Sequence, residues 1–273
     1  MLSNKQIIIR KAHPPNRLRT LWVQREALLA LTFRQIRGRF AKPAIGLTWL
    51  IIQPALQALV FSLFFGVLVR VPSDGTPYPA MVFTGVALWY LVQHSAAEGA
   101  NAFLSAAPLL RQTPMPRLYP VMASNLSASV DASIALFVAA LVGLLFGTHP
   151  GWPMLGAPLF VFVAMIASFG ISSILAALCG VWRDMRQMVP LGLQILMFAS
   201  PVIYPASLIP AEWQRLYALN PFSGIISALR WSLLGAPAPD WVNLAISFGS
   251  ALALGALGLW VFFTLEGRAA DEL

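Results

Sequence analysis

The chain has 273 residues, of which 58% are hydrophobic and only 10% are charged. A soluble domain carries about a quarter charged residues, so this composition excludes a water-exposed surface built around one core. The apolar residues come in long blocks and do not alternate with polar ones, which favours membrane-spanning helices over a β-barrel. The single cysteine, Cys179, excludes an internal disulfide framework.

The net charge of +8 does not indicate a nucleic-acid partner, because its placement follows the membrane. Most of the 18 basic residues lie near the N-terminus and the rest are scattered between apolar runs, which is the pattern of topology determinants. Those before position 43 are Lys5, Arg10, Lys11, Arg17, Arg19, Arg25, Arg34, Arg37, Arg39 and Lys42. A signal peptide is not expected, since no apolar segment with a small-residue cleavage site follows at the right distance.

Residues 21–40 are predicted to form an amphipathic helix that lies in the membrane interface. Its apolar side would carry Leu21, Leu28, Leu31, Ile36 and Phe40. Its polar side would carry Arg25, Arg34, Arg37 and Arg39.

Six apolar runs are predicted to cross a hydrocarbon core of about 30 Å. They cover residues 44–69, 80–103, 121–146, 154–181, 188–203 and 241–265. Pro54 is expected to kink the first run. Residues 204–234 fit neither a span nor a loop, because they are moderately apolar, rich in Trp, Tyr and Pro, and broken at Asn220-Pro221. We expect two short helices there that dip part-way into the outer leaflet.

The basic residues also predict the orientation of the spans. With the N-terminus inside, the outer segments hold only Arg70, Arg215 and Arg230, and the inner segments hold the remaining fifteen of the 18. This asymmetry favours cytoplasmic N- and C-termini. We therefore expect one transmembrane domain over residues 1–273, with a cytoplasmic N-terminus (1–43), a six-span region (44–265) and a cytoplasmic tail (266–273).

The sequence lacks the motifs of ATP hydrolysis and of catalysis. Lys5, Lys11 and Lys42 are the only lysines and none follows a glycine, so the chain has no Walker A loop. No His, Cys or Glu pair has metal-ligand spacing, and no nucleophile motif is present. We expect no catalytic residue, metal or cofactor in this chain. An intramembrane glycosyltransferase remains an alternative, although it would need paired acidic residues or a hydrophilic domain.

Asp131 is expected inside the third span, where a charge needs a partner or a path to water. Ser124, Ser127, Ala128 and Ala135 lie three or four residues from one another along the same helix face as Asp131. This stripe is either the wall of a polar conduit or a face at which small residues allow two helices to pack closely.

His94 and Glu98 are four residues apart and share a helix face near the inner surface. They are interpreted either as an interfacial polar pair or as a contact for an anionic lipid head group or a cytoplasmic partner.

Most aromatic residues lie near predicted span ends, where an interfacial belt is expected. Tyr204, Trp213, Tyr217 and Phe222 instead cluster within residues 204–234. Because aromatic faces stack on the apolar C–H side of sugar rings, this cluster is a candidate contact for a saccharide.

Several segments of the chain resemble one family. The first span begins with Gly-Leu-Thr-Trp-Leu-Ile-Ile-Gln-Pro (46–54), and an outer loop reads Pro-Ser-Asp-Gly-Thr-Pro-Tyr-Pro (72–79). Later segments read Arg-Asp-Met-Arg-Gln-Met-Val-Pro (183–190), Ser-Pro-Val-Ile-Tyr-Pro (200–205) and Leu-Asn-Pro-Phe (219–222). Together they resemble the permease subunits of ABC type-2 exporters of O-antigen and related polysaccharides, including capsule and teichoic-acid exporters. The resemblance covers residues 25–266.

The resemblance implies a transporter in the bacterial inner membrane, made of two copies of this chain and two copies of a separate P-loop ATPase that holds ATP and Mg. Its substrate would be polysaccharide linked to undecaprenyl diphosphate, O-antigen foremost, moved through a channel between the two permeases. A type-2 permease for a small drug or a lipid is the alternative.

The resemblance also assigns roles to segments. The N-terminal helix and the segment after the second span would dock on the ATPase, with coupling residues Leu109, Leu110, Arg111, Gln112, Thr113, Met115 and Arg117. Residues 204–234 would form periplasmic gate helices, and the channel or gate residues would be Tyr204, Trp213, Tyr217, Phe222 and Asp131.

A lipid diphosphate would need cations where it enters from the cytoplasm. Arg34, Arg37, Arg39 and Lys42 precede the first span, and arginine suits phosphate oxygens. The same four residues also have the placement of topology signals and of anchors for anionic lipids.

Overall fold

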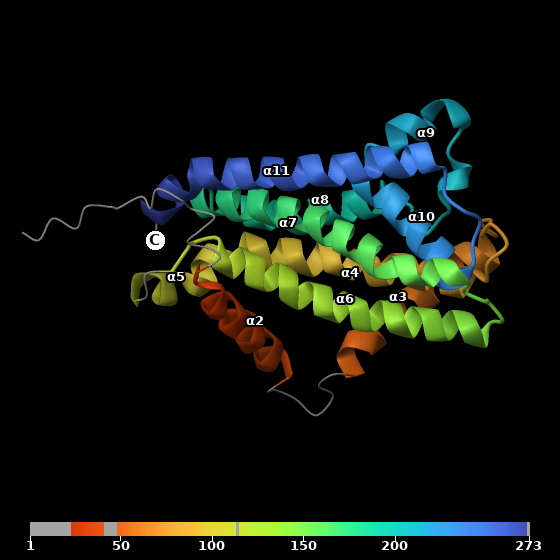
Figure 1. Cartoon of the computed structure of the whole chain (residues 1–273), viewed down its shortest axis with the longest axis horizontal. Helices are drawn as coiled ribbons and strands as arrows, with labels where there is room; N and C mark the ends of the chain where they lie inside the picture. Colours follow the sequence, from red (N-terminus) through yellow and green to blue (C-terminus); the bar gives the residue numbers. More distant parts are fainter. Residues whose placement is uncertain (1–22, 41–47, 113–114, 272–273) are drawn as a thin grey trace, which may run out of the picture.

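The computed structural model of the protein describes residues 23–40, 48–112 and 115–271, and these residues form helices and loops without a β-strand. The all-helical prediction is confirmed for this part of the chain. Its long helices run side by side along the long axis (Figure 1). They are α3 (Trp49–Phe61), α4 (Tyr78–Ala100), α6 (Tyr119–Leu145), α7 (Ala157–Val181), α8 (Met185–Phe198) and α11 (Trp241–Asp271).

Helix α4 lies at the centre of the bundle. Its side chains from Ala80 to Val92 are all buried, and it packs against α6 and α7, while α7 also packs against α11. Small residues allow these helices to approach closely: a Cβ added to Gly99 of α4 would overlap Ser172 of α7, and one added to Gly258 of α11 would overlap Gly170 of α7. Such contacts replace the hydrophobic driving force that helices lack inside lipid.

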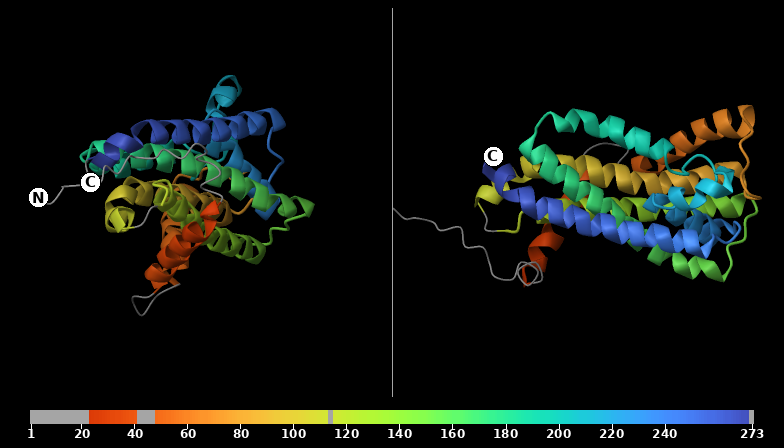
Figure 2. Two further views of the ribbon diagram at one scale, coloured as in Figure 1. Left: turned by 60° about the vertical axis from the view of Figure 1, so that its left-hand side comes forward. Right: turned by 90° about the horizontal axis from the view of Figure 1, so that it is seen from above.

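Helices α3 and α8 lie on the same face of α4, as the right-hand view of Figure 2 shows. The side-chain amide of Gln57 in α3 donates a hydrogen bond to the sulfur of Met197 in α8 (N–S 3.8 Å). Helix α3 continues as a π-helix over Ser62–Leu68. Little of this helical segment is buried, since only 17% of its most apolar stretch lies inside the protein. An apolar helix with so little cover needs lipid or another chain around it.

Four helical segments among the described residues are long and apolar enough to cross a membrane: Trp49–Leu68, Tyr119–Leu145, Trp152–Val181 and Trp241–Arg268. Helix α8 has only 14 residues. Helix α4 has 23 residues, but Gln93, His94 and Glu98 make its last third polar. The structure therefore supports four spans by length and composition, where the sequence predicted six.

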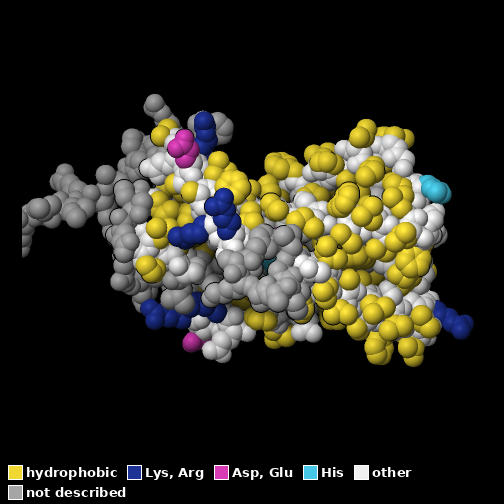
Figure 3. Space-filling view, turned by 90° about the horizontal axis from the view of Figure 1, so that it is seen from below, with side chains coloured by type: hydrophobic (Ala, Val, Ile, Leu, Met, Phe, Trp, Pro, Cys, Tyr) yellow, Lys and Arg dark blue, Asp and Glu magenta, His cyan; other side chains and the backbone are white. Residues whose placement is uncertain are grey.

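The two ends of the bundle differ in their charge. One end, which we call the α5 end, carries α2 (Arg25–Phe40), α5 (Ala102–Gln112) and the last residues of α11 (Figure 1). In the view of Figure 3, Lys, Arg and acidic side chains gather towards this end, and hydrophobic side chains cover most of the remaining surface. This distribution is that of a helical bundle with a hydrophobic belt.

The opposite end, which we call the α9 end, carries the predicted pair of short helices. These are α9 (Ala211–Tyr217) and α10 (Pro221–Leu234), preceded by a short 3-10 turn (Ala206–Leu208). The break between them falls at Asn220-Pro221, as predicted. The Asn220 side chain accepts a hydrogen bond from the Phe222 backbone N–H, which caps α10, and Gly235 ends that helix with a φ of 67°.

Two element predictions differ from the structure, and the start of a third element is not tested. The first span was predicted to begin at residue 44, but residues 41–47 lie outside the described part. The segment between the predicted second and third spans, expected from its polar and proline residues to be a short inner segment, is helical as far as Gln112, because Ala and Leu dominate α5 and Pro108 is tolerated within it. The fifth span was predicted to reach residue 203, but α8 ends at Phe198, shortly before Pro201, whose ring disfavours helical backbone.

Candidate functional site

Arg230 lies in the middle of the α9 end and is only 4% exposed. Its guanidinium donates three hydrogen bonds to backbone carbonyl oxygens. Nε donates to Met81 of α4 (3.2 Å), Nη1 to Tyr204 (3.1 Å) and Nη2 to Val202 (2.8 Å). One side chain of α10 thereby joins α4 to the segment between α8 and α9. A planar fork with five donors is suited to such multiple contacts.

The segment 199–205, which we call the clamped turn, is also held by side chains from two further places. The Tyr78 hydroxyl donates to the Ile203 carbonyl (2.7 Å), and the Asn220 amide donates to the Ala199 carbonyl (3.0 Å) and to the Ser200 hydroxyl (2.9 Å). The clamped turn is not helical, so these side chains supply hydrogen bonds that a helix would have made internally. Such bonds fix the position at which α9 and α10 begin.

Gly85 of α4 lets the clamped turn lie directly on the helix. A Cβ at this position would be 2.5 Å from the Val202 carbonyl oxygen and 3.0 Å from Nη2 of Arg230. Real Cβ atoms do not come this close to an oxygen, so any larger residue would push the clamped turn away from α4. The glycine is therefore needed for close approach rather than for an unusual backbone angle.

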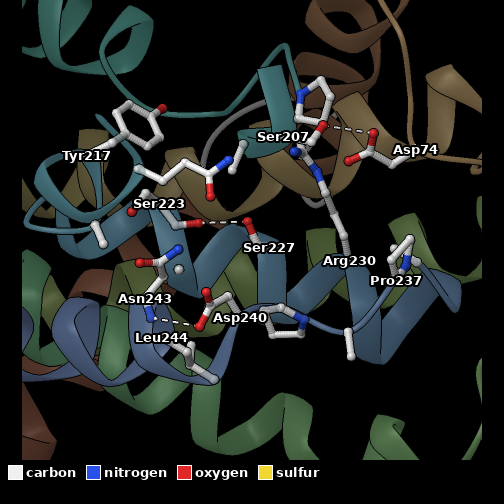
Figure 4. Close-up of a pocket in the computed structure, with 18 of the residues that line it drawn as sticks. Asp74, Ser207, Tyr217, Ser223, Ser227, Arg230, Pro237, Asp240, Asn243 and Leu244 are labelled. Atoms are coloured by element: carbon white, nitrogen blue, oxygen red, sulfur yellow. Dashed lines mark hydrogen bonds between the residues drawn. The ribbon is translucent and has the colours of Figure 1, made fainter. Parts of the chain in front are cut away.

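A polar cavity of about 270 Å³ opens beside Arg230. Its walls come from the loop before α4, from the end of the clamped turn, from α9 and α10, and from the start of α11 (Figure 4). The Ser207 hydroxyl donates to Asp74 on one side (2.8 Å), and Asp240 accepts from the backbone N–H groups of Val242 and Asn243 on the other. The cavity thus has one buried cation, two carboxylates and several hydroxyl and amide groups on its walls.

A second cavity, of about 600 Å³, lies on another side of α9 and has almost entirely apolar walls. Trp213, Tyr217 and Phe222 line it together, so the structure brings three of the four predicted aromatic residues to one place. Trp213 is exposed, whereas Phe222 is buried and its ring meets the ring of Trp89 edge-on, with centroids 6.0 Å apart. Phe222 therefore packs in the core as well as against the cavity.

Tyr204 joins this group through its hydroxyl. It donates to the Phe198 carbonyl (2.9 Å) and lies 3.1 Å from the Tyr217 hydroxyl, which must then be the donor of that second bond. Burial raises the pKa of Tyr217 above its ordinary value, so its hydroxyl keeps the proton that it donates. The pair links the clamped turn to α9.

Asp131 lies away from both cavities, on α6. Together with Ser124, Ser127, Ala128 and Ala135 it forms one buried face, and α6 packs against α4. This burial is what a close helix–helix contact requires. A role for Asp131 in a conduit stays a prediction.

His94 and Glu98 are half-buried near the last turns of α4. The ring of His94 meets the ring of Tyr90 edge-on, with centroids 5.2 Å apart. The pair is far along α4 from Met81, which contacts Arg230 at the α9 end, so it belongs to the α5 half of the bundle. Contact with a lipid or a partner stays a prediction.

At the α5 end, two of the predicted coupling residues meet the N-terminal helix. Leu109 and Met115 pack against a small buried cluster of Leu31 from α2 and Tyr119 and Ala123 from α6. Arg117 donates from Nη1 to the Glu266 carbonyl of α11 (3.1 Å). The side chains of Leu110, Arg111 and Gln112, and all of Thr113, lie outside the described part.

Two of the predicted phosphate-binding cations, Arg34 and Arg37, are exposed on α2. The Arg39 side chain and Lys42 lie outside the described residues. Exposure at the α5 end suits either a phosphate contact or an anionic-lipid anchor, so both interpretations stay predictions.

The sequence did not indicate that Arg230, Asn220 and Tyr78 donate hydrogen bonds to residues 199–205. Arg230 was counted only as one of three outer cations. A charged residue inside an otherwise apolar helical run is itself a signal of buried contacts, because its insertion into lipid is costly. Asn220 and Tyr78 carry no comparable signal, since their roles depend on a clamped turn that only the tertiary structure creates. Among the described residues, no group of three or more His, Cys, Asp and Glu side chains could hold a metal ion.

A bundle of apolar helices with charged ends and a clamped helical pair at one end defines the class of multi-pass helical membrane proteins. Residues 26–234 match the family described as ABC-2 type transporter, and the chain belongs to this family. It is therefore a membrane component of an ABC transporter and not an enzyme, and an ATPase partner is implied. The predicted resemblance is confirmed.

Curated relatives cover most of the chain at low identity. The O-antigen export system permease protein RfbA of Klebsiella pneumoniae is 22% identical over 249 residues, which cover 91% of this chain and 95% of the relative. The protein of the same name from Myxococcus xanthus is 29% identical over 218 residues, covering 77% and 81%. The polysialic acid transport protein KpsM of Escherichia coli is 21% identical over 245 residues, covering 89% and 95%.

Proposed function

We propose that this chain is the membrane subunit of an ATP-driven exporter that moves polysaccharide linked to undecaprenyl diphosphate, O-antigen foremost, out of the cytoplasm. The main support is that relatives from three bacterial species, named for O-antigen export or polysialic acid transport, match it over 77–91% of its length. In this proposal ATP and Mg are bound by two copies of a separate ATPase. Two copies of this chain enclose the path of the polymer.

The proposed transmembrane domain covers residues 1–273 and crosses the bacterial inner membrane six times, through α3, α4, α6, α7, α8 and α11. Helix α8 by itself falls short of a full crossing, because 14 residues reach only about 21 Å at 1.5 Å per residue. In this proposal the clamped turn completes the crossing that α8 begins. Non-helical backbone at membrane depth is tolerated where protein groups satisfy its carbonyls, as Arg230, Tyr78 and Asn220 do here.

The proposed orientation places the α5 end in the cytoplasm and the α9 end in the periplasm. The basic residues described at the α5 end are Arg25, Arg34, Arg37, Arg117, Arg183, Arg186 and Arg268. Those at the α9 end are Arg70, Arg215 and Arg230. An excess of basic residues marks the cytoplasmic side, so α9 and α10 would be gate helices at the periplasmic exit.

A permease for a lipid or a small drug is the second candidate. The observation that favours it is the apolar cavity of about 600 Å³ beside Trp213, Tyr217 and Phe222, which would accept a hydrocarbon more readily than a sugar. The length of chain shared with the polysaccharide-export relatives favours the first candidate.

The deciding experiment deletes the gene in its own host and measures surface polysaccharide with lectins and by gel profile, alongside lipid-linked glycan retained in the cytoplasm. Loss of surface polymer with accumulation inside, both reversed by the plasmid-borne gene, is the expected result. A plasmid-borne copy purified from these cells should also carry an ATPase with it. Normal surface polymer in the deletion strain, or a permease that purifies without any ATPase, would contradict the proposal.

A further inference from the structure

The polar cavity at the α9 end has the features of a built binding site rather than a packing defect. Packing defects in membrane bundles are small and apolar. This cavity holds about 270 Å³ and is lined by five separate stretches of chain, so it exists only in the assembled fold. Figure 4 shows side chains from α9, α10 and α11 pointing into it.

The charges on the walls select against an anion. Among the described residues Arg230 is the one cation lining the cavity, and three of its N–H groups already donate to backbone carbonyls. Asp74 and Asp240 both line the cavity, and the structure pairs only one oxygen of each. The walls therefore carry more negative than positive charge, which repels phosphate and carboxylate groups.

Unused hydrogen-bonding groups point to a polar, uncharged ligand. The structure gives the side-chain amide of Asn243 no hydrogen bond to another described residue. The Gln214 amide donates to the Ile209 carbonyl (3.0 Å), which leaves its oxygen as an acceptor. The second oxygens of the two carboxylates are acceptors as well. A ligand rich in hydroxyl groups would meet both donors and acceptors here.

The size and the apolar parts of the walls limit that ligand to one ring. Pockets for drug-sized ligands occupy about 300–1,000 Å³, so about 270 Å³ suits a single six-membered sugar rather than an oligosaccharide. Tyr217, Leu244 and Pro205 supply apolar surface among the polar groups. Proteins bind pyranose rings by combining hydrogen bonds to the hydroxyl groups with apolar contacts to the C–H groups.

We propose that the cavity between the loop before α4, helices α9 and α10 and the start of α11 binds one neutral pyranose unit, through Asn243, Gln214 and the free oxygens of Asp74 and Asp240. This site rests on the proposed function, because the exported polymer is the source of such units at the periplasmic exit. It lies on a different side of α9 from the apolar cavity of Trp213 and Phe222. Occupancy would join α10 and α11 while a sugar passes.

The test measures sugar binding to the permease–ATPase complex in lipid nanodiscs by saturation-transfer NMR. The probes are the methyl α-glycosides of glucose, galactose and mannose, the matching free sugars, and methyl glucuronide as the anionic counterpart. At least one methyl glycoside should bind saturably. The glucuronide should bind only weakly. Stronger binding of the glycoside than of the free sugar indicates a chain-linked unit as the natural source, and the reverse indicates free monosaccharide.

The variant for this test combines Gln214→Ala with Asn243→Ala. The matched control is Ser250→Ala, a polar residue of α11 that does not line the cavity. The double variant should weaken glycoside binding about tenfold, which corresponds to about 1.4 kcal/mol, while the control changes it less than twofold. Gel filtration with bound ATPase shows that each variant is folded.

Three outcomes would overturn the proposed site. The first is that no glycoside binds saturably up to about 100 mM, a concentration far above millimolar affinity. The others are unchanged glycoside binding in the folded double variant, or glucuronide binding as strong as that of the glycosides. Export in the deletion strain separates this failure from that of the proposed function. If the plasmid-borne wild-type gene restores surface polymer but glycosides do not bind, only the sugar site fails. If it restores no polymer, the proposed function fails first.

Discussion

Arg230 carries a positive charge into a position that is only 4% exposed, and no carboxylate of the described residues lies within ion-pair distance of it. Its charge is instead compensated by three carbonyl oxygens, which are the negative ends of backbone dipoles. A cation held in this way costs less than an isolated buried charge, but removing it leaves three carbonyls without donors. We therefore infer that the side chain positions the clamped turn.

The first prediction concerns this side chain. Arg230→Met should lower the free energy of unfolding in detergent by at least about 3 kcal/mol, since each buried acceptor left without a donor costs about 1–3 kcal/mol. Arg230→Lys should recover part of the loss, because an ammonium group keeps the charge but not the planar fork. Chemical denaturation followed by tryptophan fluorescence measures both changes.

Arg215→Met is the matched control, because Arg215 is an exposed arginine on the neighbouring helix α9. An exposed substitution of this kind should change the free energy of unfolding by less than about 0.5 kcal/mol. If Arg230→Met were no less stable than Arg215→Met, the three hydrogen bonds would not hold the clamped turn.

At the scale of elements, the two ends of the bundle are joined to the rest of the molecule in different ways. The α9 end depends on hydrogen bonds from side chains to the clamped turn. The α5 end depends on apolar contacts, with Leu31 of α2 packed among Leu109 and Met115, and includes a hydrogen bond from Arg117 to α11. A force applied to α5 would thus reach α2, α6 and α11 directly.

The second prediction tests this element. Charge reversal at Arg111 and Arg117 to Glu should abolish export while the ATPase continues to hydrolyse ATP. The reason is that the end of α5 and the segment after it would no longer be attracted to the ATPase, and Arg117 would lose its hydrogen bond to the Glu266 carbonyl of α11. Export in the complemented deletion strain and ATP hydrolysis by the purified complex are the two measurements.

Arg268→Glu is the control, since Arg268 is an exposed arginine at the same end of the bundle but on α11. It should leave export and membrane insertion intact. Unchanged export in the Arg111 and Arg117 double variant would refute the coupling role of the segment.

At the scale of the whole molecule, the six-span arrangement makes a prediction about sides. In a Cys179→Ala background, single cysteines at His149 and Glu212 should react with a membrane-impermeant maleimide in intact spheroplasts. Single cysteines at Ser105 and Asp184 should react only after permeabilisation. All four positions are exposed in the structure, so accessibility to the reagent depends on the side of the membrane.

Removal of Cys179 should itself be tolerated, because the side chain is small and buried and the chain has no other cysteine. Labelling of Glu212→Cys and Asp184→Cys from the same side would contradict a crossing by α8 and its clamped turn. The proposed six-span arrangement would then be wrong at its fifth span.

Much of the α9 end was predictable from local sequence. The break at Asn220-Pro221 was expected, and the structure places it between α9 and α10 because Asn220 caps the second helix and Pro221 suits its first position. The end of α8 has a local signal as well, since Pro201 disfavours helical backbone. The path of the clamped turn was not predictable, because it depends on donors from α4, from Asn220 and from α10.

Phe222 illustrates the limit for single residues. Its sequence context groups it with Tyr204, Trp213 and Tyr217, and three of these four do line one apolar cavity. Hydropathy cannot tell that Phe222 is buried against Trp89 while Trp213 is exposed, because both residues are large and aromatic. That difference depends on how α10 sits on α4.

The sequence by itself determined that this protein is a helical membrane protein, that its basic residues gather at one end, and that it carries no Walker A loop. These properties follow from run lengths, charge placement and the positions of the lysines, none of which requires tertiary contacts. Only the tertiary structure decided that Arg230 holds the clamped turn and that five distant stretches enclose a polar cavity. The reason is physical: a hydrogen bond to a backbone carbonyl depends on where that backbone passes in space, and every residue offers the same carbonyl.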